Sequence, residues 1–284
     1  MTIAINRPAE LDTPFPLPGA QVQQYTRDGY IKLRNVLSPE VLAAYEPEIT
    51  GKVIELNTQH VPLAERDTYG KAFLQIGNLW RHSPAVEGFV RSTRLARIAA
   101  ELLQVRAVRL YHDQALYKEA SGGITPWHRD QYYWPLSTDK TITVWIPLQD
   151  TRAEMGPLAF AAGSHRSSHG RELLISDESE QALADFVAST GYQVDDAPYA
   201  LGDLSFHSGW TLHRAGPNTM PTPRRAMTII YMDADIQITE PDNSWREADW
   251  HKWLSDAPVG GRPEGPLNPV LYDSTRVRRD KAGA

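Results

Sequence analysis

The chain has no cysteine among its 284 residues. This absence excludes disulfide bonds, thiolate zinc sites, iron–sulfur clusters and a cysteine nucleophile. Any metal site therefore has to be built from histidine, aspartate and glutamate side chains. The chain also lacks an apolar run near the roughly 18 residues that a membrane-spanning helix needs, so we expect no membrane partner.

Basic residues are not in excess, since 29 lysines and arginines face 35 aspartates and glutamates and give a net charge of −6. This balance argues against a nucleic-acid partner, although it leaves room for a local basic pocket. Residues 1–18 have no apolar stretch of the signal-peptide kind, and Lys281–Ala284 form no peroxisomal or retention signal. We therefore expect a cytoplasmic protein.

The remaining composition is that of a globular chain, with 41% hydrophobic and 23% charged residues. Four prolines predict an extended N-terminal arm over residues 1–20, and we expect a single domain over 21–284, since no repeat or linker is evident. Ser38 and Pro39 are typical of a helix start. Alternating apolar residues predict a strand over 29–36, and a polar stretch predicts an irregular segment over 60–76. Apolar residues at helical spacing predict helices over 22–27, 39–56, 84–103 and 178–189.

After Gln104 the sequence pattern changes to short alternating or β-branched runs, which are separated by turns rich in Gly, Pro and Asp. This pattern predicts a β-sandwich or barrel. The predicted strands are 105–117, 127–134, 141–148, 157–161, 203–207, 211–215 and 224–232. The tail from Pro241 shows no clear periodicity.

One histidine of the nine, His128, has a carboxylate two residues on, at Asp130. Chance alone provides roughly one such match, so the spacing is weak by itself. The neighbouring aromatic residues favour a strand, on which residues i and i+2 share one face about 6.6 Å apart at Cα. Two ligands of one metal ion can converge from such a pair.

A third ligand has to come from elsewhere, and both His207 and His213 lie in the segment 202–218. Two histidines and one carboxylate form the facial triad of non-haem Fe(II) oxygenases, and zinc hydrolases use the same ligands. An oxygenase that uses 2-oxoglutarate also needs a cation for the distal carboxylate. Arg224 and Arg225 are candidates on opposite faces of one strand, and the alternation does not choose between them.

Taken together, these segments resemble the phytanoyl-CoA dioxygenase-like family of Fe(II)/2-oxoglutarate-dependent oxygenases. The resemblance covers roughly residues 20 to 235 in order, through segments 28–38, 111–118, 126–134, 143–148, 156–165, 202–203 and 213–218 and Arg224. It implies a mainly β fold with flanking helices. The implied core is a double-stranded β-helix (jelly-roll, cupin-like) over about 105–235, followed by a C-terminal extension over 236–284.

The resemblance also assigns site residues. It implies Fe(II) bound by His128, Asp130 and His213, with 2-oxoglutarate and O2 as co-substrates. His207 comes six residues too early to keep the spacing to Arg224. Because Asp130 keeps the carboxylate that related halogenases replace by a small residue, no halide site is expected.

The same resemblance implies a pocket for 2-oxoglutarate. Arg224 looks like the anchor of its distal carboxylate, Lys118 and Trp145 match positions that line the pocket, and Gln114 is a further candidate. Many relatives have a hydroxyl two residues after the distal histidine, where this chain has Ala215. We expect structural roles for His112 and His165.

For the substrate, an aromatic cluster and the segment 63–79 are candidate pocket residues: Tyr132, Tyr133, Trp134 and Trp210. Such a lining suits a bulky small molecule, and we expect natural-product tailoring by hydroxylation, cyclisation or epimerisation. Three alternatives remain. They are another metal-dependent enzyme on the same barrel, an acyl-CoA hydroxylase, which the lack of a basic cluster disfavours, and a non-catalytic jelly-roll binding protein.

Overall fold

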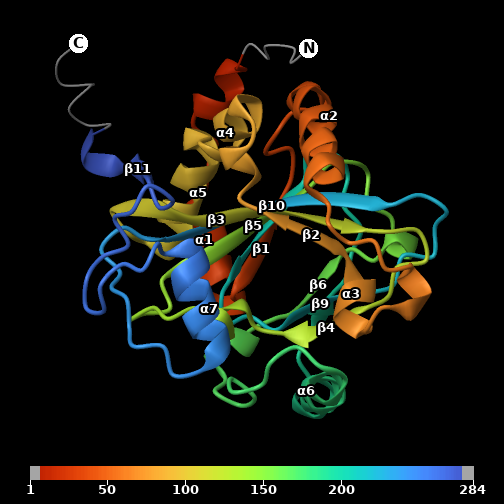
Figure 1. Ribbon diagram of the computed structural model, residues 1–284. Coiled ribbons are helices and arrows are strands. Elements are labelled where there is room, and N and C mark those ends of the chain that lie inside the picture. Colours follow the sequence, from red (N-terminus) through yellow and green to blue (C-terminus); the bar gives the residue numbers. More distant parts are fainter. Residues whose placement is uncertain (1–6, 277–284) are drawn as a thin grey trace.

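A computed structural model describes residues 7–276 of the chain. Two antiparallel sheets face each other, with the larger one running across the middle of the molecule (Figure 1). The larger sheet has the strand order β1-β8-β5-β10-β3-β11, with β2 also paired to β3, and the smaller sheet has the order β4-β9-β6-β7. This is the predicted jelly-roll arrangement. The strands are β1 (Tyr30–Leu33), β2 (Leu74–Gly77), β3 (Ala107–Lys118), β4 (Thr125–His128), β5 (Thr141–Pro147), β6 (Leu158–Ala161), β7 (Val194–Asp195), β8 (Leu204–Ser208), β9 (His213–Ala215), β10 (Arg224–Asp233) and β11 (Val270–Asp273).

Helices flank the two sheets. The main core cluster joins residues of α2, α4 and α5 to the outer face of the larger sheet, whereas α6 packs near β4 of the smaller sheet (Figure 1). The α-helices are α1 (Gly19–Asp28), α2 (Pro39–Leu56), α3 (Thr68–Ala72), α4 (Pro84–Val90), α5 (Thr93–Leu103), α6 (Asp177–Thr190) and α7 (Ser244–Trp253). None of the helices in the described part of the chain is long and apolar enough to cross a membrane.

Local sequence explains where the helices begin and end. The Ser38 side chain accepts a hydrogen bond from Val41 N, and Pro39 fills the first turn, so the predicted helix over 39–56 is confirmed. The helix predicted over 84–103 is instead two helices. Ser92 interrupts it, because its hydroxyl accepts from Leu95 N at 3.3 Å and caps the start of α5.

The strand predicted over 127–134 is wrong beyond His128. The chain turns into the 3-10 helix η4 (Asp130–Tyr133), where Gln131 N donates to Gly209 O at 2.9 Å. The Arg129 side chain is buried and donates to the carbonyls of Trp210 and His169 at 3.0 and 2.6 Å. These bonds end the strand, so His128 and Asp130 do not share one strand face.

Other differences lie in segments without a clear period. Within the predicted irregular stretch 60–76, α3 forms and β2 pairs with β3, and the tail contains α7 and β11. In the predicted N-terminal arm, Ala9–Asp12 forms a 3-10 turn, and Leu11 is buried with its carbonyl accepting from Ser92 Oγ. Residues 1–6 of that arm, and residues 277–284 with the C-terminal sequence discussed above, lie outside the described residues.

The register of the larger sheet places polar residues on its inner face. Across β3, β10, β5 and β8, cross-strand partners point to the same side of the sheet. Three such rows contain the residues of interest: Lys118 and Arg224; Gln114, Thr228, Trp145 and Ser205; and His112, Ile230, Thr143 and His207. The site lies on this face, between the two sheets.

Candidate metal centre

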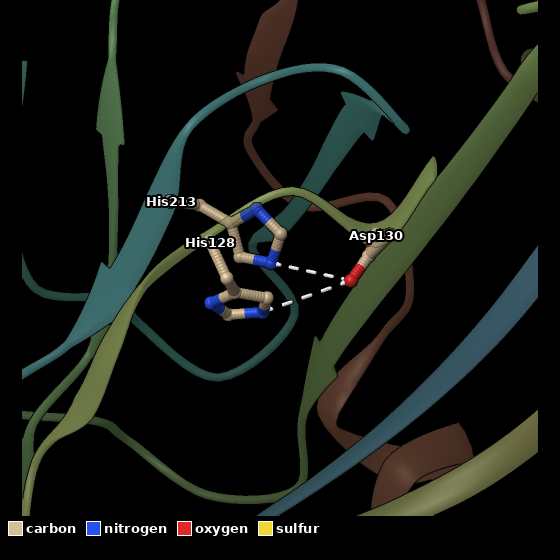
Figure 2. A group of neighbouring side chains, drawn as sticks. All are labelled: His128, Asp130 and His213. Carbon is tan, nitrogen blue, oxygen red and sulfur yellow. Dashed lines mark ion pairs between the residues drawn. The ribbon is translucent and has the colours of Figure 1, made fainter. Parts of the chain in front are cut away.

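His128, Asp130 and His213 converge on one point, and their ligand atoms lie within 4.8 Å of one another. His128 is at the end of β4, Asp130 begins η4, and His213 begins β9 as the register partner of His128. The two Nε2 atoms lie 3.7 and 3.6 Å from Asp130 Oδ1 (Figure 2). Two imidazoles and one carboxylate in this arrangement can hold a divalent metal on one face and leave other positions open.

Both histidines present the same ring nitrogen to Asp130. His128 Nδ1 lies 2.7 Å from Pro126 O, and His213 Nδ1 lies 3.0 Å from Thr211 O. A carbonyl can only accept a hydrogen bond, so Nδ1 carries the proton and Nε2 offers its lone pair. Burial lowers the pKa of each histidine to about 4, and both rings are therefore neutral at neutral pH.

Two further side chains fix the carboxylate of Asp130. Its Oδ2 accepts a hydrogen bond from Thr143 Oγ1 at 3.2 Å and lies 3.2 Å from His207 Nε2. Burial opposes ionisation of this carboxyl, but His213 and His207 hold its pKa below the ordinary value. Oδ1 is thereby left for a metal. The spacing argument set His207 aside as a ligand and gave no signal for this supporting contact, which depends on the pairing of β5 with β8.

The structure distinguishes the two arginines that the alternation left open. Arg224 is only 2% exposed, and its guanidinium lies 5.3 Å from the centre of the Trp145 ring. It donates to Gly156 O at 3.1 Å and to Leu116 O at 3.4 Å, whereas its Nε has no partner among the described residues. Arg225 points outward and pairs with Glu46. Arg224 is thus the arginine inside the barrel.

Lys118 lies beside Arg224 as its register partner and is fully buried. Its Nζ donates to Gly123 O and lies 3.4 Å from Thr125 Oγ1. Burial and the neighbouring Arg224 lower the pKa of Lys118 to about 6. Within residues 7–276 neither basic group has a carboxylate partner, so the pocket fits an incoming anion such as a dicarboxylate.

The aromatic residues predicted at the pocket lie on different segments near the metal ligands. Tyr133 follows Asp130 in η4, packs edge-on against Tyr132 and accepts a hydrogen bond from Ile175 N at 3.0 Å. Trp134 belongs to a buried cluster and packs against Tyr111 with ring centres 5.3 Å apart. Trp210 lies against Arg171 at 4.3 Å. Gln114 is inside the barrel and accepts from the Gln75 amide.

Two polar residues near the centre were not named by sequence reasoning. Tyr69 of α3 is 40% exposed and donates to Gln75 Oε1 at 2.6 Å. Asp249 of α7 accepts from Tyr111 Oη at 3.0 Å, and burial raises its pKa to about 7. Tyr69 belongs to the segment 63–79 expected at the pocket, whereas the weak periodicity of α7 gave no signal for Asp249.

Comparison with known proteins gives a consistent result. Residues 25–226 match the family described as phytanoyl-CoA dioxygenase. A probable alpha-ketoglutarate-dependent hypophosphite dioxygenase from Stutzerimonas stutzeri is 26% identical over 230 residues, which are 76% of this chain and 78% of the relative. The ectoine dioxygenase of Streptomyces avermitilis is 23% identical over 251 residues, which are 81% and 83% of the two chains.

Solved structures of similar fold include two enzymes of nogalamycin biosynthesis. The non-heme alpha-ketoglutarate-dependent carbocyclase SnoK aligns with a TM-score of 0.74 and 26% identity, over 92% of this chain and all of SnoK. The epimerase SnoN, solved with Fe3+, alpha-ketoglutarate and nogalamycin RO, aligns with a TM-score of 0.73 and 22% identity, over 89% and 98% of the chains. At that identity, the likeness to SnoN concerns the fold alone.

Proposed function

Because the chain belongs to the phytanoyl-CoA dioxygenase family, we propose that it is an Fe(II)/2-oxoglutarate-dependent dioxygenase in which His128, Asp130 and His213 hold the iron. The observation that carries this assignment is the meeting of these three ligands with two buried basic groups, Arg224 and Lys118, on one side of the barrel. Metal hydrolysis explains the three ligands but not the two buried basic side chains. An anionic co-substrate explains both.

Different residues of the site bind the metal and the co-substrate. His128 and His213 bind the metal as neutral imidazoles, and Asp130 adds one negative charge through Oδ1 while Thr143 and His207 hold its Oδ2. Fe(II) with 2-oxoglutarate and O2 supplies the oxidative decarboxylation that drives oxidation of a substrate C–H bond. Arg224 and Lys118 bind the distal carboxylate of 2-oxoglutarate, with Trp145 and Gln114 on the same face.

The proposed substrate is a bulky small molecule, and the proposed role is tailoring of a natural product. Tyr132, Tyr133 and Trp210, with Trp134 in the layer behind, lie on segments next to Asp130 or to His213. The fold and 26% identity shared with SnoK support such a substrate. An acyl-CoA is disfavoured because the sequence shows no basic cluster for its phosphates.

Release of succinate tests the assignment. The protein is supplied with Fe(II), 2-oxoglutarate and ascorbate in air, and a panel of polycyclic and glycosylated small molecules is scored by stimulated succinate formation. Asp130→Ala is expected to lose both iron and turnover. An absence of succinate with every compound, combined with metal-dependent hydrolysis, contradicts the oxygenase. If the wild type and Asp130→Ala bind a compound of the panel equally well and neither turns it over, the protein is a non-catalytic binding protein.

A further inference from the structure

Three buried polar groups near Trp145 lack hydrogen-bond partners in the described part of the chain. They are the Nε of Arg224, the hydroxyl of Tyr199 and the hydroxyl of Ser205. All three side chains are essentially inaccessible, at 2%, 3% and 0% exposure. A buried polar group without a partner is unfavourable and uncommon in folded proteins, so three of them in one place require an explanation.

The three groups surround one indole ring. The Tyr199 ring centre lies 4.8 Å from that of Trp145, and the Arg224 guanidinium lies 5.3 Å from it. Ser205 is the register partner of Trp145 on β8. Burial raises the pKa of Tyr199 well above its ordinary value, while the neighbouring Ser205 hydroxyl and the Arg224 guanidinium lower it. The two hydroxyls therefore lie close to each other, although no hydrogen bond of normal geometry joins them.

The remaining surroundings are mostly apolar. Tyr199 and Trp145 belong to a buried cluster with Leu158, Phe160 and Ala215, and the hydroxyl of Tyr30 in that cluster is bonded to Asp195. Lys32 Nζ lies 4.6 Å from the centre of the Tyr199 ring and is also bonded to Asp195. Two backbone hydrogen bonds with Thr151, of 2.9 and 3.0 Å, fix the main chain of Tyr199, and its ring packs on Trp145 at 3% exposure, so the phenol is held inside the barrel. A ligand with several acceptor oxygens would give all three groups a hydrogen-bond partner.

We propose that the hydroxyls of Tyr199 and Ser205 complete, with Arg224, the binding site for the distal carboxylate of 2-oxoglutarate. The proposal rests on the proposed function, because it takes 2-oxoglutarate as the co-substrate. A carboxylate has about four lone-pair sites and accepts from a guanidinium and two hydroxyls together. The three donors match that requirement, and no hydroxyl from position 215 is needed.

The test compares two 2-oxoacids. 2-Oxoglutarate and 2-oxopentanoate share the end that chelates a metal, but 2-oxopentanoate lacks the distal carboxylate. Each is titrated anaerobically into the Fe(II)-loaded protein in a calorimeter. Tyr199→Phe and Ser205→Ala are each expected to weaken 2-oxoglutarate by about tenfold, the loss of a hydrogen bond to a charged group, and to leave 2-oxopentanoate unchanged.

A second measurement separates this role from simple packing. In the metal-free protein, Tyr199→Phe removes an unpaired buried hydroxyl, so its melting temperature is expected to equal or exceed that of the wild type. Tyr231→Phe is the matched control, because Tyr231 also has an unpaired buried hydroxyl but lies in the core cluster shared with the helices. This variant is expected to bind 2-oxoglutarate like the wild type.

The outcomes are distinct. If both variants bind 2-oxoglutarate as tightly as the wild type, or if both 2-oxoacids weaken equally, the role of Tyr199 and Ser205 is refuted while the proposed function stands. If the wild type binds 2-oxoglutarate no better than 2-oxopentanoate, the proposed function fails as well. A lower melting temperature of metal-free Tyr199→Phe with unchanged affinity assigns the hydroxyl to the fold and overturns the proposal.

Discussion

The carboxylate of Asp130 uses its two oxygens for different tasks. Oδ1 faces His128 and His213, and Oδ2 is occupied by Thr143 and His207. A carboxylate held in this way can offer a metal one oxygen only, which keeps more coordination positions open for a co-substrate and O2. The selection of one oxygen by its neighbours is the most specific feature of the proposed iron site.

Replacing His207 tests that feature. We expect His207→Leu to weaken Fe(II) binding by about 10- to 100-fold, the usual effect of removing a group that orients a metal ligand. The reason is that Asp130 then keeps only the Thr143 hydrogen bond at Oδ2, so its carboxylate is less firmly oriented. Fe(II) affinity is measured anaerobically by competition with a chelating dye. His207→Gln should retain most of the affinity, because its amide can still donate. Equal losses in both variants contradict the orienting role.

The lowered pKa of Lys118 leads to a prediction about pH. With a pKa of about 6, Lys118 is mostly neutral at pH 7.5 in the free protein, whereas a bound carboxylate favours its charged form. Binding of 2-oxoglutarate is therefore expected to take up a proton, and its affinity to fall as the pH rises above about 6. Calorimetric titration in two buffers of different ionisation enthalpy measures the uptake.

Lys118→Met is the control for this prediction, since it keeps the length of the buried side chain without the amine. The variant should show no proton uptake and a flatter dependence of affinity on pH between 6 and 9. Proton uptake of the same size in Lys118→Met assigns the effect to another group.

At the scale of elements, α7 is the part of the C-terminal extension that reaches the site. Trp253 is buried and stacks on His112 with ring centres 4.2 Å apart, and Arg246 donates to Tyr132 O at 2.9 Å. A Cβ atom on Gly77 would overlap the Trp253 ring, so only glycine allows β2 to pass this close. The helix therefore closes one side of the barrel next to Asp130.

Removal of the Trp253 side chain should measurably lower the stability of the fold. We expect Trp253→Ala to lower the free energy of unfolding by about 3–5 kcal/mol, as for other large buried aromatic residues. Trp245→Ala, on the same helix but 50% exposed, should change it by less than about 1 kcal/mol. Urea unfolding followed by circular dichroism provides the comparison. Similar values for the two variants mean that α7 does not pack on the barrel as the structure has it.

Sequence reasoning succeeded where one local signal dominates. Ser38 and Pro39 determine the start of α2, and the resemblance placed the jelly-roll core and put His128, Asp130 and His213 in one site. It was wrong where tertiary contacts prevail. The strand through His128 ends because Arg129 and Gln131 bond to distant backbone, and Asp249 reaches the site because α7 docks on β3. No periodicity within either segment encodes those contacts.

At the scale of the whole molecule, the proposed iron site joins the two sheets. The smaller sheet carries His128 and His213, and the larger sheet carries Thr143 and His207, with Asp130 bonded between them. The net charge of −6 does not oppose an anionic co-substrate here, because Arg224 and Lys118 are buried in the pocket away from the acidic surface. A metal and a co-substrate bound at this site would therefore add contacts between the two sheets to those of the apolar cluster that they already share.

Removal of the metal should therefore lower the stability of the whole fold. A ligand at 100 times its dissociation constant adds about 2.7 kcal/mol to the free energy of unfolding, provided that it binds the folded state alone. We expect Fe(II) under anaerobic conditions to raise the melting temperature, 2-oxoglutarate to raise it further only when the metal is present, and EDTA to reverse both effects. Asp130→Ala should melt at one temperature, whether alone, with Fe(II), with Fe(II) and 2-oxoglutarate, or after EDTA. A rise in melting temperature caused by 2-oxoglutarate without metal would contradict this expectation. It would mean that Arg224 and Lys118 bind the distal carboxylate independently of the iron site.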